Sequence, residues 1–148
     1  MRKNNLFFLA LAAFVFSGIS YAETCPRVDE IKSQALAAWK AYDTDDQPLS
    51  AQQEALFKKN MVAFTLAEWT NQPSHGGAIH CYYRDKNGSN LEAYLSKNNF
   101  VPQKSSRYWY QVTGYMHCAA GMEQCAFEKS PALAMQQRLT KQPHLAEK

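Results

Sequence analysis

The chain has 148 residues, of which 46% are hydrophobic and 20% are charged, and this is enough to bury one modest core. The formal net charge of +3 falls to +1 once Arg2 and Lys3 are removed with the N-terminal segment, because 14 basic residues then face 13 acidic ones. This near-neutral balance argues against a nucleic-acid-binding protein.

Residues 1–22 have the pattern of a secretory signal peptide. A basic start precedes an uncharged apolar run at residues 6–19, and Ser20 and Ala22 are the small residues expected before a cleavage site. The run is too short to span a membrane comfortably. The residue before Cys25 is not the small residue that a lipoprotein signal needs. We therefore expect cleavage after Ala22, no lipid anchor, and export to a bacterial periplasm or, alternatively, to the medium.

Four cysteines remain after this cleavage, and an even number in an exported domain indicates two disulfides. Three pairings are possible. We favour Cys118 with Cys125, because the six residues between them can form a tight loop. Cys25 is then left to tie the N-terminal segment to Cys81.

Helical periodicity follows the N-terminal cysteine, over residues 28–42. The apolar residues on one stripe of this predicted helix are Ile31, Ala35, Ala38, Trp39 and Tyr42. A second helix is predicted over residues 51–59, because Ser50 and Gln53 have the spacing of a capping box.

Residues 61–70 alternate in a way that predicts a strand. A helical alternative stays open, because Leu56, Asn60, Ala63 and Ala67 could continue the preceding helix. As a strand, this segment could lie at a sheet edge and recruit a partner strand.

A hairpin is the clearest strand signal in the chain. Two alternating runs meet at Asn87-Gly88, which tolerates the positive φ angles of a tight turn. A three-residue loop with a bulge places Cys81 opposite Leu95 and gathers the apolar residues on one face. The apolar face carries Ile79, Cys81, Tyr83, Leu91, Ala93 and Leu95, and the wetter face carries His80, Tyr82, Arg84, Glu92 and Tyr94.

The last part of the domain is rich in aromatic and β-branched residues. Their alternation over residues 107–118 predicts one long strand. Residues 125–128 predict a short edge strand that could also recruit a partner. Residues 131–148 predict a polar, partly disordered tail. The fold class is therefore α+β within residues 23–130, with one or two N-terminal helices packed on a four- to five-stranded antiparallel sheet and two disulfides.

Two strand histidines suggest a metal site as one hypothesis. His80-Cys81 and His117-Cys118 repeat the same dipeptide, and His75 could add a third ligand if the two strands are neighbours. Two histidines without an acidic partner make a weak site, so solvated histidines are the simpler interpretation. The acidic residues expected to be solvated are Asp29, Glu30, Glu54, Glu68 and Glu92. We predict no resident metal, no cofactor and no catalytic residue.

The aromatic residues are the better indication of function. Tyr82, Tyr94, Trp109 and Tyr115 are predicted on the face opposite the cysteines, where they would form an interaction surface for a partner protein or a sugar. The alternative is that the predicted helices, carrying Trp39 and Phe57, pack on this face.

The chain also resembles a known family in a Cys-Pro start, a strand with Cys-Tyr-Tyr and a late cysteine pair. The segments that carry the resemblance are CPRVDEI, FTLAEW, GGAIHCYY and YWYQVTGYMHCAAGMEQCAFE. They are similar to small exported proteins of intracellular gammaproteobacteria, in particular the periplasmic EirA family associated with the Dot/Icm type IV secretion system. The resemblance implies a non-enzymatic periplasmic protein that supports a secretion machine or intracellular growth, and it transfers no functional residues.

Together these patterns predict a periplasmic accessory or binding protein that contacts an envelope protein or a second copy of itself. The alternatives are a secreted effector and a small exported metal-dependent hydrolase that uses the histidines. No phosphate-binding glycine loop and no nucleophile elbow is present in the sequence.

Overall fold

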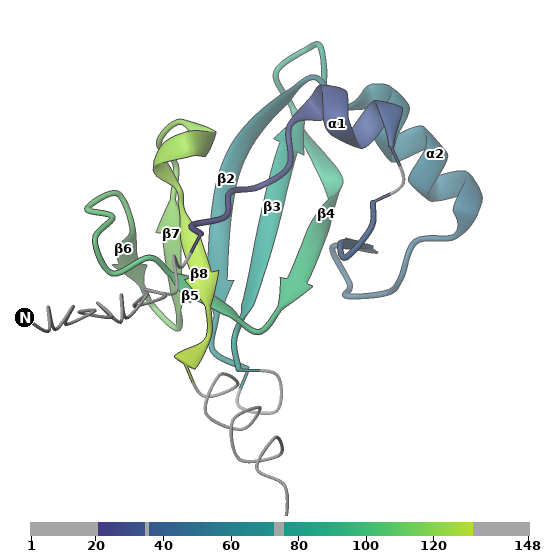
Figure 1. The fold of residues 1–148 in the computed structure, drawn as a ribbon. Helices are drawn as coiled ribbons and strands as arrows, with labels where there is room; N and C mark the ends of the chain where they lie inside the picture. The colour runs from purple at the N-terminus through teal and green to yellow at the C-terminus, as the bar shows by residue number, and fades with distance from the viewer. Residues whose placement is uncertain (1–20, 35, 73–75, 132–148) are drawn as a thin grey trace, which may run out of the picture.

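The computed structural model describes residues 21–34, 36–72 and 76–131 (Figure 1). The predicted signal peptide lies almost entirely outside the described residues, as do His75 and nearly all of the predicted tail. The elements in chain order are α1 (Val28–Ser33), β1 (Lys40–Asp43), α2 (Ala51–Asn60), β2 (Ala63–Thr70), β3 (Ala78–Arg84), β4 (Asn90–Asn98), β5 (Phe100–Pro102), β6 (Tyr110–Val112), β7 (Tyr115–Cys118), the 3₁₀ helix η2 (Met122–Gln124) and β8 (Phe127–Lys129).

The described strands form two antiparallel sheets. Six strands make a large sheet in the order β1-β4-β3-β2-β7-β6, and β5 pairs with β8 in a small one. The predicted α+β class is confirmed. The predicted number of strands was too low, because β1, β5 and the split between β6 and β7 had not been foreseen. No helix within the described ranges is long and apolar enough to cross a membrane.

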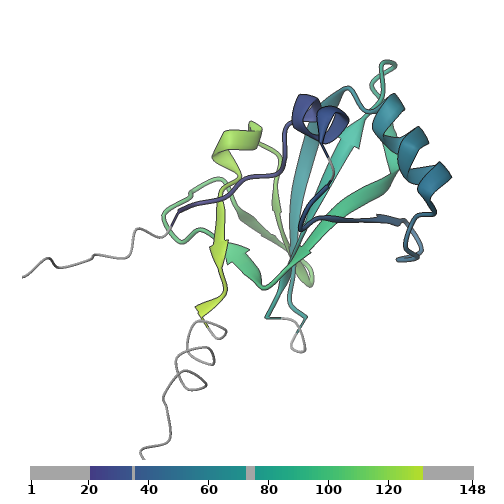
Figure 2. The ribbon, with the colours of Figure 1, turned by 45° about the vertical axis from the view of Figure 1, so that its right-hand side comes forward.

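One face of the large sheet forms the core. Ile79, Cys81 and Leu95 are fully buried there. Figures 1 and 2 show the N-terminal segment running from β8 to α1 along this face. The disulfide Cys25–Cys81 joins that segment to β3, and Cys118–Cys125 closes the loop before β8. The structure therefore has the disulfide pairing that the sequence favoured.

The β3–β4 hairpin has the predicted register in its centre, with Cys81 opposite Leu95. The bulge lies within the strands, between Tyr82 and Arg84, rather than in the loop. The loop itself is closed by Asp85, whose Oδ1 accepts hydrogen bonds from the backbone N–H groups of Asn87 and Ser89. The three-residue loop therefore begins one position earlier than expected.

The first predicted helix is much shorter than its periodicity indicated. It ends at Ser33, and residues 40–43 become β1, which pairs with β4 from Lys40 opposite Ser96 to Asp43 opposite Ala93. The backbone hydrogen bonds between residues 40–43 and the edge of β4 outweigh the local preference of these residues for a helix. Trp39 packs edge-on against Phe127, with ring centroids 6.1 Å apart.

The second helix follows the prediction closely. The Ser50 hydroxyl accepts a hydrogen bond from the Gln53 backbone N–H at 3.3 Å, and the Gln53 side chain accepts one from the Ser50 N–H at 2.9 Å. This capping box starts α2, which ends one residue beyond the predicted limit. Phe57 of α2 is buried in the disulfide-side core.

The predicted strand at residues 61–70 is confirmed, but it is not an edge. β2 lies between β3 and β7, so the proposed recruitment of a partner along it is wrong. The short strand near residues 125–128 is also flanked on both sides, because β8 pairs with β5 while Phe127 bridges to Glu23.

The long strand predicted at residues 107–118 is two strands joined by a turn. Gly114 has a φ angle of +82°, which an L-residue side chain disfavours, and β6 and β7 pair back on each other around it. The isolated glycine was the local signal for this reversal.

Candidate functional site

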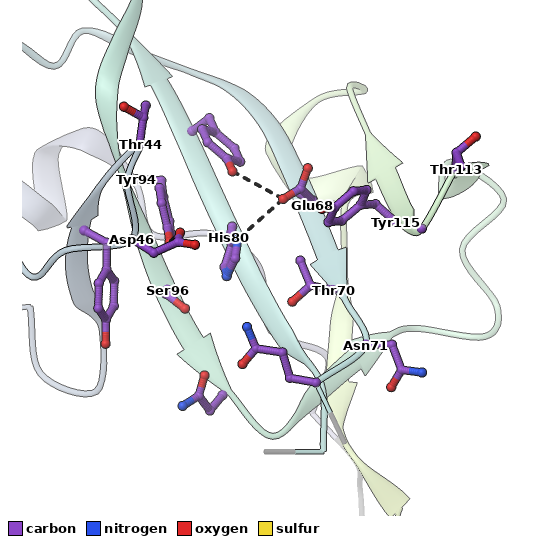
Figure 3. Close-up of a pocket in the computed structure, with 15 residues that line it drawn as sticks. Thr44, Asp46, Glu68, Thr70, Asn71, His80, Tyr94, Ser96, Thr113 and Tyr115 are labelled. Carbon is purple, nitrogen blue, oxygen red and sulfur yellow. Dashed lines mark hydrogen bonds and ion pairs between the residues drawn. The ribbon is translucent and has the colours of Figure 1, made fainter. Parts of the chain in front are cut away.

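The face of the large sheet opposite the disulfide between Cys25 and Cys81 carries a hollow of about 770 Å³. No residue of α1 or α2 lines it. β2, β3 and β4 supply its floor, the loop after β1 forms one wall, and the β6–β7 turn forms the other (Figure 3). We call this cavity the polar hollow.

The first wall is fixed by a tyrosine from the floor. The Tyr94 hydroxyl donates a 2.5 Å hydrogen bond to Asp46 Oδ1. Asp46 has a φ of +60°, and its loop is held because Asp43 Oδ1 accepts from the backbone N–H groups of Asp45 and Gln47. Burial, followed by the bond to Asp46, raises the pKa of Tyr94, so the phenol stays protonated and keeps donating.

Glu68 of β2 is the centre of the floor. Its register partners are His80 of β3 on one side and His117 of β7 on the other. Glu68 Oε1 lies 3.4 Å from His80 Nδ1, and Oε2 lies 2.7 Å from His117 Nε2. The Tyr82 hydroxyl also donates to Oε1, at 3.3 Å. One carboxylate therefore joins three strands.

The environment of Glu68 sets its protonation. Burial of the carboxylate raises its pKa, but the hydrogen bonds and charges of His80 and His117 outweigh burial and hold the pKa below its ordinary value of 4.5. Burial, together with the neighbouring negative charge of Glu68, raises the pKa of Tyr82. At neutral pH the floor therefore contains an ionised carboxylate and a neutral phenol.

This low pKa predicts a pH-dependent stability. The unfolded chain has the ordinary Glu68 pKa, so the stabilisation is complete above that value and is lost as the pH falls through the lower folded-state pKa. We expect Glu68→Gln to cost about 2 kcal/mol at neutral pH. In urea denaturation, the difference in unfolding free energy between this variant and the wild type should narrow as the pH falls below the ordinary pKa of 4.5. Glu92→Gln, at an exposed position of β4, is the control, and an equal narrowing in both variants would contradict the assignment.

The polar hollow brings together three of the four residues of the predicted interaction surface. Tyr82, Tyr94 and Tyr115 line it. Trp109 does not belong there: it is only 8% exposed, and its indole N–H donates to the Ala126 carbonyl oxygen at 2.9 Å in the disulfide-side core. The chain reverses at Gly114, between Trp109 and Tyr115, so the alternation of a single strand does not predict which face each of these two residues occupies.

The alternative that helices cover this face is wrong. Trp39 and Phe57, which were expected to mark that packing, lie in or against the core on the disulfide side. A tyrosine that the sequence did not indicate, Tyr42, also lines the polar hollow, because β1 exists where a helix was predicted.

The two histidines are brought close to one carboxylate. The expected solvation of Glu68 was wrong, since only 15% of its side-chain surface is exposed. Within residues 21–34, 36–72 and 76–131, no group of three or more His, Cys, Asp or Glu residues is arranged to hold a metal ion. The missed signal was a single charged residue, Glu68, within an otherwise uncharged, alternating segment, FTLAEW.

Comparison with known proteins identifies the family. No curated protein and no solved structure matches the chain. A family model described as "Protein of unknown function (DUF3757)" matches residues 20–128, a range that contains the four cysteines and every residue lining the polar hollow. This match covers well over half of the 148 residues of the chain, and the chain therefore belongs to the DUF3757 family.

Proposed function

We propose that this protein is an exported binding protein without catalytic activity, which contacts its partner in the cell envelope through the polar hollow. The observation that carries the proposal is the hollow itself, an open face of the sheet lined by tyrosines and polar side chains. An antiparallel sheet can leave such a face to solvent, so the support for binding is the gathering of four tyrosines and many polar side chains in one hollow.

The cysteines support export. All four form disulfides, which persist in oxidising compartments such as the bacterial periplasm. Residues 1–22 have the signal-peptide pattern. We place the protein in the periplasm, with release to the medium as a secreted effector as the alternative. Fractionation of cells into periplasm and medium separates the two locations.

The geometry of Glu68 supports binding rather than turnover. Both carboxylate oxygens are engaged by groups of the chain itself, His80, Tyr82 and His117. The network therefore serves as a rigid floor, which favours recognition by a preformed surface. The resemblance to the EirA family supports a partner that belongs to a secretion machine, with consequences for virulence.

A site-specific crosslink tests this function. Tyr115 is 44% exposed at the rim of the polar hollow, and Leu56 on α2 is 57% exposed away from it. With photoreactive benzoylphenylalanine at each position, we expect irradiated cells to give a specific adduct from position 115 and none from position 56. Adducts from position 56 alone, or from neither position, would reject the assignment of this face.

A further inference from the structure

We propose that the polar hollow binds an uncharged carbohydrate chain. This inference rests on the proposed function, because it uses the same binding face, and it names a carbohydrate chain as the part of the envelope partner that enters the hollow. Three features carry it: an unpartnered hydroxyl in the floor, the balance of hydrogen-bonding groups around it, and the tyrosines.

Thr70 is the first feature. It is 8% exposed at the end of β2, it lines the polar hollow, and its hydroxyl oxygen has no hydrogen-bond partner among the described residues. Figure 3 shows its side chain among the residues of the floor, beyond Glu68 on the same strand. A buried hydroxyl without a partner is less stable than one that is hydrogen-bonded. The oxygen is covered in this conformation, so a ligand hydroxyl in the hollow would satisfy it after the Thr70 side chain turns about χ1.

The charge of the lining favours a neutral ligand. Among the described residues that line the polar hollow there is no lysine or arginine, so a phosphate, sulfate or carboxylate would find no permanently charged cation in that lining. The lining has two carboxylates: Glu68 lies against His80 and His117, and Asp46 Oδ1 accepts from the Tyr94 hydroxyl. An anionic ligand would therefore lose its hydration without a compensating ion pair.

The hydrogen-bonding groups favour hydroxyls over an ammonium. Besides Thr70, the lining includes the hydroxyls of Thr44 and Ser96 and the amides of Asn71, Gln72 and Asn98. Hydroxyl and amide side chains both donate and accept, whereas an ammonium only donates. A polyhydroxyl ligand uses both directions, and an amine would leave the amide N–H groups unpaired.

The tyrosines add the apolar contact that a sugar ring needs. Tyr82 and Tyr94 lie on the floor with ring centroids 5.4 Å apart, and Tyr42 stacks on Tyr94 at 5.8 Å. Tyr115 stands at the opposite rim. Tyr94 is itself only 5% exposed, so the C–H face of a sugar ring would pack on Tyr42, Tyr82 or Tyr115 while its hydroxyls reach the polar groups. The volume of about 770 Å³ is within the range of small-ligand sites.

The test is a glycan array followed by calorimetry with the chain as it is exported. The probes are neutral oligosaccharides of glucose, mannose and N-acetylglucosamine, with glucosamine oligomers as the cationic arm and sialylated and sulfated glycans as the anionic arm. We expect binding to a neutral probe, and Thr70→Val should weaken it about tenfold by removing one hydrogen bond without changing side-chain shape. Thr65→Val is the matched control, because Thr65 is on the same strand and also has a buried, unpartnered hydroxyl, but it does not line the polar hollow.

The outcomes distinguish a failure of this inference from a failure of the proposed function. Binding of a neutral glycan that Thr70→Val weakens and Thr65→Val does not, with both variants melting at or above the wild-type temperature, supports the inference. Binding only to cationic or anionic probes, equal affinities in the two variants, or no binding at all would overturn it. In each of these cases a specific adduct at position 115 would leave the proposed function standing, while loss of that adduct would remove both.

Discussion

Replacing Cys25 and Cys81 together by alanine is expected to lower the free energy of unfolding by about 4 kcal/mol. This disulfide links residues 56 positions apart, and restricting so long a loop removes much of the entropy of the unfolded chain. The bond also anchors the segment that leads to α1 on β3. Cys25 and Cys81 are both almost fully buried, so this disulfide lies within the core.

The second disulfide is the internal comparison. Cys118 and Cys125 are only 7 positions apart, so replacing both by alanine should cost about 2 kcal/mol. Urea denaturation of the two double variants and the wild type measures the difference. Alanine pairs are used because a single substitution would leave a free thiol that could form new bridges. Equal losses in the two variants would contradict the loop-length argument.

Substitution of Gly77 by alanine is expected to cost about 4 kcal/mol, from backbone strain, steric overlap and a lost hydrogen bond. Gly77 has a φ of +91°, and an added Cβ would lie 2.8 Å from the Phe100 carbonyl oxygen. The same Cβ would overlap Trp69 Nε1, which donates to that oxygen at 3.0 Å. The indole would have to leave its position against β5.

Gly88 separates the two causes. Its φ of +84° is similar to that of Gly77, but an added Cβ would meet nothing within 4 Å. Gly88→Ala should therefore show only the cost of the left-handed backbone, about 1 kcal/mol. Thermal and urea unfolding of both variants provide the measurement. Similar losses at the two positions would show that the close contact at Gly77 is relieved by movement of its neighbours.

Local chemistry explains why parts of this fold could be predicted. Ser50 and Gln53 are three residues apart, and their reciprocal hydrogen bonds need nothing outside that turn. The pairing of Cys81 with Leu95 followed from alternation on both sides of a single loop. In each case the deciding interactions lie within a few residues or across one tight connection.

The rest depended on contacts between distant segments. Glu68, His80 and His117 meet only because β2 lies between β3 and β7, and no local pattern encodes that order. The same holds for β1, whose residues have a helical period but complete the edge of β4. Trp109 was misplaced because one glycine, Gly114, reverses the chain where alternation indicated a continuous strand.

The pairing of Glu23 with Phe127 brings together two segments near the ends of the described part of the chain. Their backbones exchange hydrogen bonds of 2.8 and 2.9 Å, beside the small sheet and away from the polar hollow. A short linker could therefore join the ends, and new termini could be opened in the exposed loop at Gly88. In such a circular permutant, Cys25 and Cys81 stay in one uninterrupted segment, and Cys118 and Cys125 stay in the other. The topology of this fold therefore does not require the chain to begin and end at its natural positions.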